Sequence, residues 1–205
     1  MTEIKSEHVE WAIVDRLRQM LRDTNEFEFN VTRTYSLFAS TLCWSLQRIR
    51  SREVRIEIDN RAGRLRVLLE NESVAEAPWN MNLDNQQRRI NFHDIPIRIP
   101  PPIRFDGHMA MRFLINLRDA AAHSDARNVT PFNFNRDSKR VLAGFTFRCE
   151  ERRVRQTTWT GQITLLESDM KRIAISLADK FCDSLSGGSS NFVEDAANNL
   201  LEAAA

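Results

Sequence analysis

The sequence predicts a mainly α-helical fold, a bundle of four to five helices with one inserted β-hairpin. Apolar residues recur at intervals of three and four along four long segments, as they do on the buried face of a helix. One later region is rich in β-branched and aromatic residues on both sides of a charged stretch, which is typical of a hairpin. With 205 residues, 42% of them hydrophobic, the chain can bury one sizeable core. We therefore expect a single helical domain over residues 1–185.

The first two helices have the clearest boundaries. Ser6 is a suitable N-cap, and an amphipathic pattern follows it to about Thr24. Asn30 is a second suitable N-cap, after which the chain runs to Arg50 without glycine or proline. This second segment carries one continuous apolar stripe, so we expect it at the centre of the core.

The stretch from 51 to 105 contains conflicting signals. Val54, Ile56 and Ile58 alternate with charged residues as in a strand, yet the leucines that follow are spaced for a helix. We favour a helix over 60–72. Five prolines then interrupt the pattern between 78 and 105, which predicts an irregular arm that is partly in polyproline II geometry. So long an arm is usually functional or packed against its domain.

The second half of the chain predicts a helix, a hairpin and another helix. Asp106 can cap a helix that ends near His123, and the hairpin covers about 141–166. Ser168 can cap the last core helix, and 186–205 would be a flexible linker and a short terminal helix. The apolar rows predict that six residues share one core: Leu42, Leu46, Phe113, Leu117, Ile173 and Leu177.

Composition excludes several classes of protein. The 29 basic and 28 acidic residues nearly cancel, so bulk charge cannot hold this chain on nucleic acid, although a local basic site remains open. Twenty-five of the cations are arginine, which suits phosphate recognition but also follows from a GC-rich genome. The three cysteines are too far apart for a zinc knuckle, and we expect no metal and no cofactor. No signal peptide and no spanning segment is evident, so we expect a cytoplasmic protein.

The segment RDAAAH, residues 118–123, carries the candidate chemistry. Asp119 and His123 are four residues apart on the expected helix, so the carboxylate can orient the imidazole tautomer. Arg118 adds a permanent positive fork near the same face. A proton-transfer histidine, an orienting acid and an arginine for phosphate are suitable for cleaving a phosphodiester without metal, if an RNA 2′-hydroxyl is the nucleophile.

A structural explanation of the same residues also exists. The bare spacing R-x-x-x-x-H arises by accident roughly 0.5 times in such a chain, and it occurs a second time at Arg88 and His93. An exposed pair of Asp119 and His123 near a helix C-terminus is favourable by itself, because the helix dipole stabilises a cation there. The acid directly after Arg118, and the strong helix that carries it, distinguish the later copy.

RDAAAH resembles the R-[polar]-x-x-x-H motif of the HEPN superfamily, helical domains of prokaryotic toxins, defence systems and RNA-processing enzymes. The resemblance covers residues 6–185 as architecture and six residues as a motif. It implies a bundle that is usually dimeric, with two motifs facing each other across the interface, and metal-independent endoribonuclease activity. By this resemblance His123 would be the general base or acid, Arg118 would stabilise the phosphorane, and Asp119 would orient His123.

The resemblance predicts a toxin–antitoxin or phage-defence ribonuclease that has RNA, a second copy of itself and an antitoxin protein as partners. The alternative is a non-catalytic HEPN-like module that binds nucleotide, RNA or a partner protein, and a buried or paired Arg118 would favour it. Toxins regulated by nucleotidylation carry a tyrosine two residues after the histidine, where this chain has Asp125, so we do not expect that regulation. The motif explains neither the proline-rich arm nor the hairpin.

Overall fold

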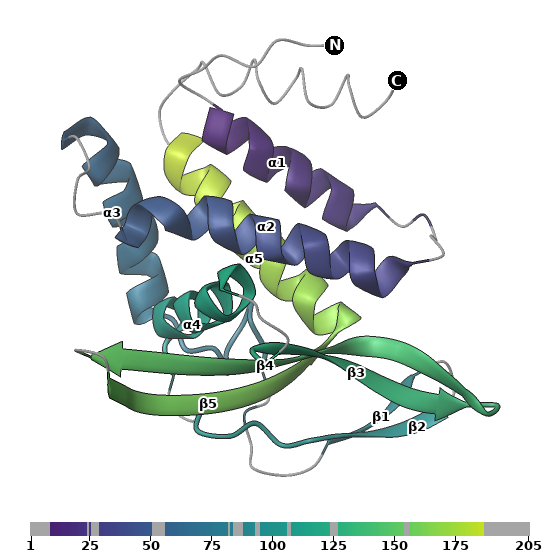
Figure 1. Cartoon of the computed structure of the whole chain (residues 1–205). Coiled ribbons are helices and arrows are strands. Elements are labelled where there is room, and N and C mark those ends of the chain that lie inside the picture. Colours follow the sequence, from purple (N-terminus) through teal and green to yellow (C-terminus); the bar gives the residue numbers. More distant parts are fainter. Residues whose placement is uncertain are drawn as a thin grey trace.

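The chain has a mixed α/β fold, so the mainly α prediction was wrong. The computed structural model describes residues 9–23, 25, 29–50, 56–81, 83, 88–92, 95–105, 108–123, 127–153 and 156–186. The helices are α1 Val9–Arg22, α2 Asn30–Arg50, α3 Ile56–Asn71, α4 Ala110–Ala122 and α5 Glu167–Ser186 (Figure 1). The strands are β1 Arg88–Phe92, β2 Ile95–Ile99, β3 Val129–Arg136, β4 Lys139–Arg153 and β5 Gln156–Leu166. They form two antiparallel sheets, β1–β2 and β3–β4–β5.

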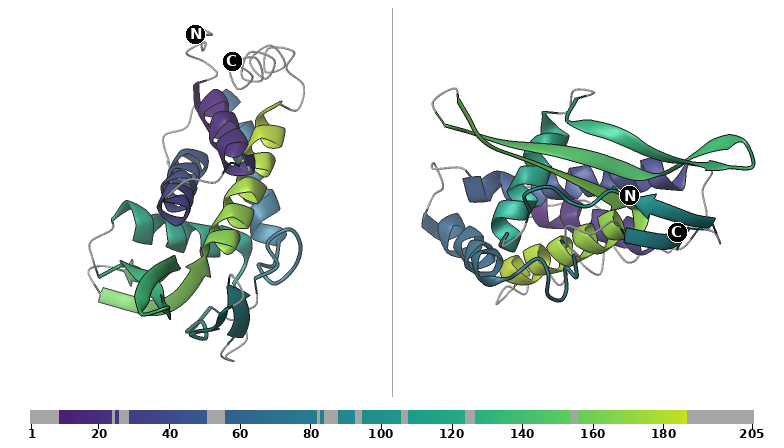
Figure 2. Two further views of the ribbon diagram at one scale, coloured as in Figure 1. Left: turned by 90° about the vertical axis from the view of Figure 1, so that its right-hand side faces the viewer. Right: turned by 90° about the horizontal axis from the view of Figure 1, so that it is seen from below.

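The helices lie in a layer on one face of the three-stranded sheet (Figures 1 and 2). Helix α4 lies between the sheet and helix α2, and α5 leaves the end of β5 to run back across the layer. The β1–β2 hairpin lies on the opposite side of the sheet. None of the described helices is long and apolar enough to cross a membrane.

The helices predicted from apolar spacing are confirmed, with shifted ends. The predicted cap Ser6 lies outside the described residues, as does the tail 187–205. Helix α3 begins at Ile56, so Ile56 and Ile58 are helical and the strand alternative was wrong for them, whereas Val54 lies outside the described residues. Helix α4 begins later than predicted, with Met109 at its N-cap position and no side-chain cap. Asp106, the predicted cap, lies outside the described residues.

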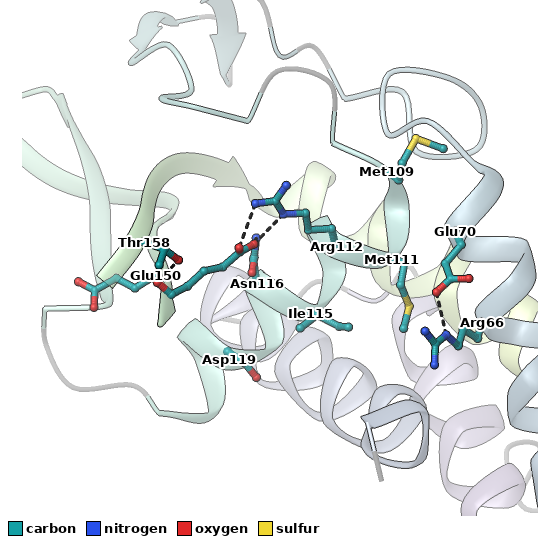
Figure 3. Close-up of a pocket in the computed structure, with 11 residues that line it drawn as sticks. Arg66, Glu70, Met109, Met111, Arg112, Ile115, Asn116, Asp119, Glu150 and Thr158 are labelled. Atoms are coloured by element: carbon teal, nitrogen blue, oxygen red, sulfur yellow. Dashed lines mark hydrogen bonds and ion pairs between the residues drawn. The ribbon is translucent and has the colours of Figure 1, made fainter. Parts of the chain in front are cut away.

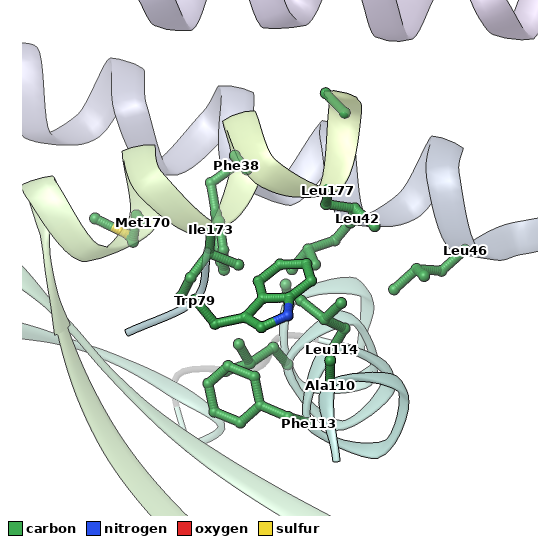
Figure 4. Close-up of a cluster of buried hydrophobic side chains, with 14 of the residues drawn as sticks. Phe38, Leu42, Leu46, Trp79, Ala110, Phe113, Leu114, Met170, Ile173 and Leu177 are labelled. Atoms are coloured by element: carbon green, nitrogen blue, oxygen red, sulfur yellow. The ribbon is translucent and has the colours of Figure 1, made fainter. Parts of the chain in front are cut away.

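The predicted shared core is confirmed. All six residues expected to meet there are at most 2% exposed and belong to one apolar cluster (Figure 4). Trp79 also lies in this cluster, fully buried between Ile173 of α5 and Phe113 of α4, and its indole N–H donates to Glu72 at 2.8 Å. Its segment follows α3 and belongs to the predicted arm. The arm therefore starts by completing the helical core.

The proline-rich segment 78–105 was expected to be irregular, and instead it contains the β1–β2 hairpin. Isoleucines alternate with Pro96 and Arg98 through β2, so Ile97 and Ile99 face inward. They pack with Phe134 and neighbours in a second, smaller apolar cluster. Proline is tolerated because each strand of a two-stranded sheet has a free edge. Polyproline II geometry was therefore the wrong expectation over Ile95–Ile99.

The predicted hairpin at 141–166 is confirmed as β4 and β5, and it gains a third strand. Strand β3 pairs along β4 but was missed, because Pro131 and alternating asparagines weaken its strand signal. The sheet joins the helical layer through aromatic contacts, with the ring centroids of Tyr35 and Phe145 only 4.4 Å apart. The hairpin is thus one wall of the main core, which explains why the bundle interpretation was insufficient.

Candidate functional site

The RDAAAH segment lies at the C-terminal end of α4. Phe113, Leu114 and Leu117 bury one side of this helix completely in the core. The remaining face carries Arg118 and Asp119, whose side chains are each 22% exposed. His123 follows the last helical residue and is exposed. The fold therefore leaves the motif accessible at the edge between the helices and the sheet.

Arg118 and Asp119 form an ion pair with each other. Nη1 of Arg118 donates to Oδ1 of Asp119 at 2.8 Å. Nε of the same guanidinium is buried and has no hydrogen-bond partner among the described residues.

Two thiols near this ion pair have raised pKa values. Burial raises the pKa of Cys43 on α2, an effect that Arg118 opposes and Asp119 assists. Burial and Asp119 raise the pKa of Cys149 on β4 to about 12, so this thiol stays protonated at neutral pH.

His123 is held through its backbone. Its N–H donates to the carbonyl of Asp119 at 3.0 Å, and its own carbonyl accepts from Nδ2 of Asn128 at 3.3 Å. Within the described part of the chain, no hydrogen bond joins the side chains of Asp119 and His123. The structure therefore brings Asp119 to Arg118, whereas the sequence predicted that Asp119 orients the imidazole of His123.

A pocket of about 550 Å³ lies beside Asp119, between α3, α4 and the β4–β5 hairpin (Figure 3). Met111 and Ile115 supply apolar surface from α4, and Asn116 lies with Asp119 on the polar side. Arg66 of α3 lies at the far wall, paired with Glu70 at 2.7 Å. The pocket is therefore partly apolar and bordered by charged groups, and one residue of the motif, Asp119, lines it.

Arg112 and Glu151 connect α4 to the sheet across this pocket. The guanidinium binds the carboxylate through two hydrogen bonds of 2.6 and 3.0 Å, and Asn116 donates to the same carboxylate at 3.4 Å. The hydrogen bond from Arg112 holds the pKa of Glu151 below its usual value, and that bond in turn raises the pKa of Arg112. The Arg112 guanidinium also lies over the Trp159 ring, 5.8 Å from its centroid. These contacts fix one wall of the pocket.

Arg112, Asn116 and Glu151 were not predicted from the sequence, although part of the signal was present. Arg112, Asn116, Asp119 and His123 are spaced by four, three and four residues, so they form one polar stripe along α4. The stripe could have been read from the sequence. Its partner Glu151 could not, because it is 39 residues from Arg112 and depends on how the sheet packs.

The accidental copy of the motif is not on a helix. Arg88 begins strand β1, and His93 lies outside the described residues. Among the described residues, no three His, Cys, Asp or Glu side chains gather as they would around a metal ion. Residues 118–122 of RDAAAH, by contrast, lie on α4 as predicted, and His123 follows directly.

No family model matches the chain, and neither a curated protein nor a solved structure gives a significant match.

Proposed function

We propose that this protein is a metal-independent endoribonuclease of the HEPN type, acting in a toxin–antitoxin or phage-defence setting. The observation that carries the proposal is the polar stripe of α4. It runs from Arg112 in a pocket of about 550 Å³ to His123, an imidazole that is open to solvent. Such a stripe leads from a pocket that can hold part of a substrate to a proton-transfer group at the end of the helix.

The parts of the reaction are assigned as follows. His123 removes the proton from an RNA 2′-hydroxyl, whose oxygen attacks the adjacent phosphorus. Arg118 stabilises the charge that develops on the phosphorane. The 5′-oxygen leaves with a proton from a general acid, which gives a 2′,3′-cyclic phosphate and a 5′-hydroxyl. Asp119 holds the guanidinium of Arg118, at 2.8 Å, in place of the histidine. Asp119 is therefore a positioning residue in this proposal.

We expect the active form to be a homodimer. One motif supplies a single histidine, whereas acid–base cleavage uses a proton-transfer group at each end of the reacting system. A two-fold axis supplies the second histidine from the same surface of a second copy. Light scattering at micromolar concentration should give twice the mass of 23.8 kDa. A monomer under those conditions would count against the proposed arrangement. An antitoxin protein is a further proposed partner.

A non-catalytic module that binds nucleotide, RNA or protein is the second candidate. Its support is the ion pair between Arg118 and Asp119, since a guanidinium that is already paired and partly buried has fewer donors for a phosphate. Cleavage decides between the two candidates, because both are compatible with the ion pair.

Cleavage should continue when divalent ions are removed. The test incubates the purified protein with single-stranded RNA, with and without EDTA. The expected products end in a 2′,3′-cyclic phosphate, and 2′-deoxy substitution at the cleavage position should block their formation. Activity that disappears in EDTA and returns with a divalent ion would reject the chemistry. RNA that is bound but stays intact under all conditions would favour the second candidate.

A further inference from the structure

We propose that a basic surface at one end of the molecule binds the phosphate backbone of single-stranded RNA. This surface, the basic tip, lies on the β1–β2 hairpin and the β3–β4 turn. Its residues are Arg89, Arg98, Arg136, Lys139 and Arg140. The choice of RNA as the polyanion rests on the proposed function, and the basic tip adds a binding surface that lies outside the RDAAAH segment.

The β1–β2 hairpin places two arginines directly opposite each other. Ile90 pairs with Ile97, and both pack against the second apolar cluster. Because successive side chains alternate between the faces of a strand, Arg89 and its partner Arg98 point away from that cluster, and both are exposed. Like charges opposite each other on a sheet are destabilising. The pair therefore does not stabilise the fold. An anion bound between the two guanidinium groups would relieve their repulsion.

The β3–β4 turn adds three more cations. Asp137 and Ser138 both have positive φ, as in a two-residue hairpin turn, so Arg136 and Lys139 pair directly across it. Arg140 follows on β4. The carboxylate of Asp137 is 94% exposed and reaches Arg136 only at 3.9 Å. One acid beside three cations leaves the turn with a net positive charge.

The hairpin and the turn belong to one surface because they share the second apolar cluster. Ile97 and Ile99 of β2 pack there with Phe134 of β3 and Ala143 of β4. Figure 2 shows the β1–β2 hairpin beside the end of the sheet where β3 turns into β4. The two parts of the basic tip therefore lie next to each other.

Four of the five cations of the basic tip have no acidic partner among the described residues, unlike most other arginines there. Among the described residues, the side chains of Arg89, Arg98, Lys139 and Arg140 make no ion pair and no hydrogen bond. Most described arginines elsewhere bind a carboxylate. Examples are Arg22 with Asp179, Arg33 with Asp23, Arg66 with Glu70, Arg112 with Glu151 and Arg172 with Asp169. Unpaired guanidinium groups retain all their donors for phosphate oxygens.

The experiment measures binding of an RNA that cannot be cleaved. The probe is a fluorescein-labelled 2′-O-methyl oligouridylate of about 12 nucleotides, which is within the site sizes of single-strand binders. The double variant Arg89→Ser with Arg98→Ser should bind at least about tenfold more weakly at low salt. The slope of log K against log salt should fall in magnitude by about 1.4, since each lost phosphate contact accounts for about 0.7.

Two controls distinguish a loss of RNA binding at the basic tip from a general effect of lower net charge and from unfolding. Arg22→Ser with Arg64→Ser removes two exposed arginines from α1 and α3, and it should leave affinity and slope unchanged. Arg98→Glu places an acid opposite Arg89, so it should raise the melting temperature slightly while weakening RNA binding. Unchanged affinity in the Arg89 and Arg98 variants overturns the inference, as does binding to anionic phosphatidylserine vesicles without binding to RNA.

The outcome is distinguishable from that of the proposed function. If His123→Ala abolishes cleavage but the basic-tip variants bind the probe like the wild type, RNA does not bind at the basic tip and the proposed ribonuclease activity is supported. If the basic-tip variants lose binding but no RNA is ever cleaved, the proposed ribonuclease activity is wrong and RNA binding at the basic tip is supported.

Discussion

Replacing Phe113 with alanine should lower the free energy of unfolding by about 3–5 kcal/mol. The ring is completely buried on the inner face of α4, and its centroid lies 5.6 Å from that of Phe105 in an edge-to-face arrangement. Removing it opens a cavity between the helices and the sheet, where neighbouring groups can collapse only partly. Urea denaturation, extrapolated linearly to water, measures the change.

The matched control for Phe113 is Val67→Ala on α3. Val67 is also an apolar residue within a helix, but it is 58% exposed. Its loss should change the free energy of unfolding by no more than about 0.5 kcal/mol. Equal effects of the two variants would show that α4 does not join the helical layer to the sheet. The site would then lose its structural basis, because α4 carries Arg118 and Asp119 and His123 follows its last residue.

The predictable part of the fold was the part determined by local periodicity. Helix α2 has an apolar stripe of its own, and Leu42 and Leu46 were correctly assigned to the core because a stripe on a long helix must be covered. Strand β3 had no such signal. Its pairing with β4 supplies the missing stability, and no pattern within Val129–Arg136 reveals that partner.

The structure of the proline-rich segment was predicted wrongly for a related reason. Pro96 lowers the strand propensity of β2, yet Ile97 and Ile99 gain burial against Phe134, a residue more than 30 positions away. Tertiary packing outweighs local preference here. The ion pair of Arg112 with Glu151 could not be predicted either, because its two residues are also far apart in the sequence. A local pattern could thus locate RDAAAH on a helix, but it could not show the pocket beside it.

Replacing His123 with alanine should lower the rate of RNA cleavage by about 10²–10⁴ without unfolding the protein. The imidazole is exposed, so the free energy of unfolding should change by no more than about 1 kcal/mol. His93→Ala, in the accidental copy of the motif, is the control and should cleave like the wild type. Single-turnover cleavage and urea denaturation measure the two quantities on the same preparations.

Arg118→Ala should reduce cleavage as strongly, and Asp119 should act through it. Nη1 of Arg118 donates to Oδ1 of Asp119, a bond that the amide oxygen of Asp119→Asn can still accept. Asp119→Asn should therefore be milder, and adding it to Arg118→Ala should cost nothing further, since the two residues form one unit. Independent, additive losses would mean that Asp119 serves His123 after all. Loss of cleavage only in variants that also unfold, or equal loss in His93→Ala, would make RDAAAH a structural feature and leave the non-catalytic module as the function of this fold.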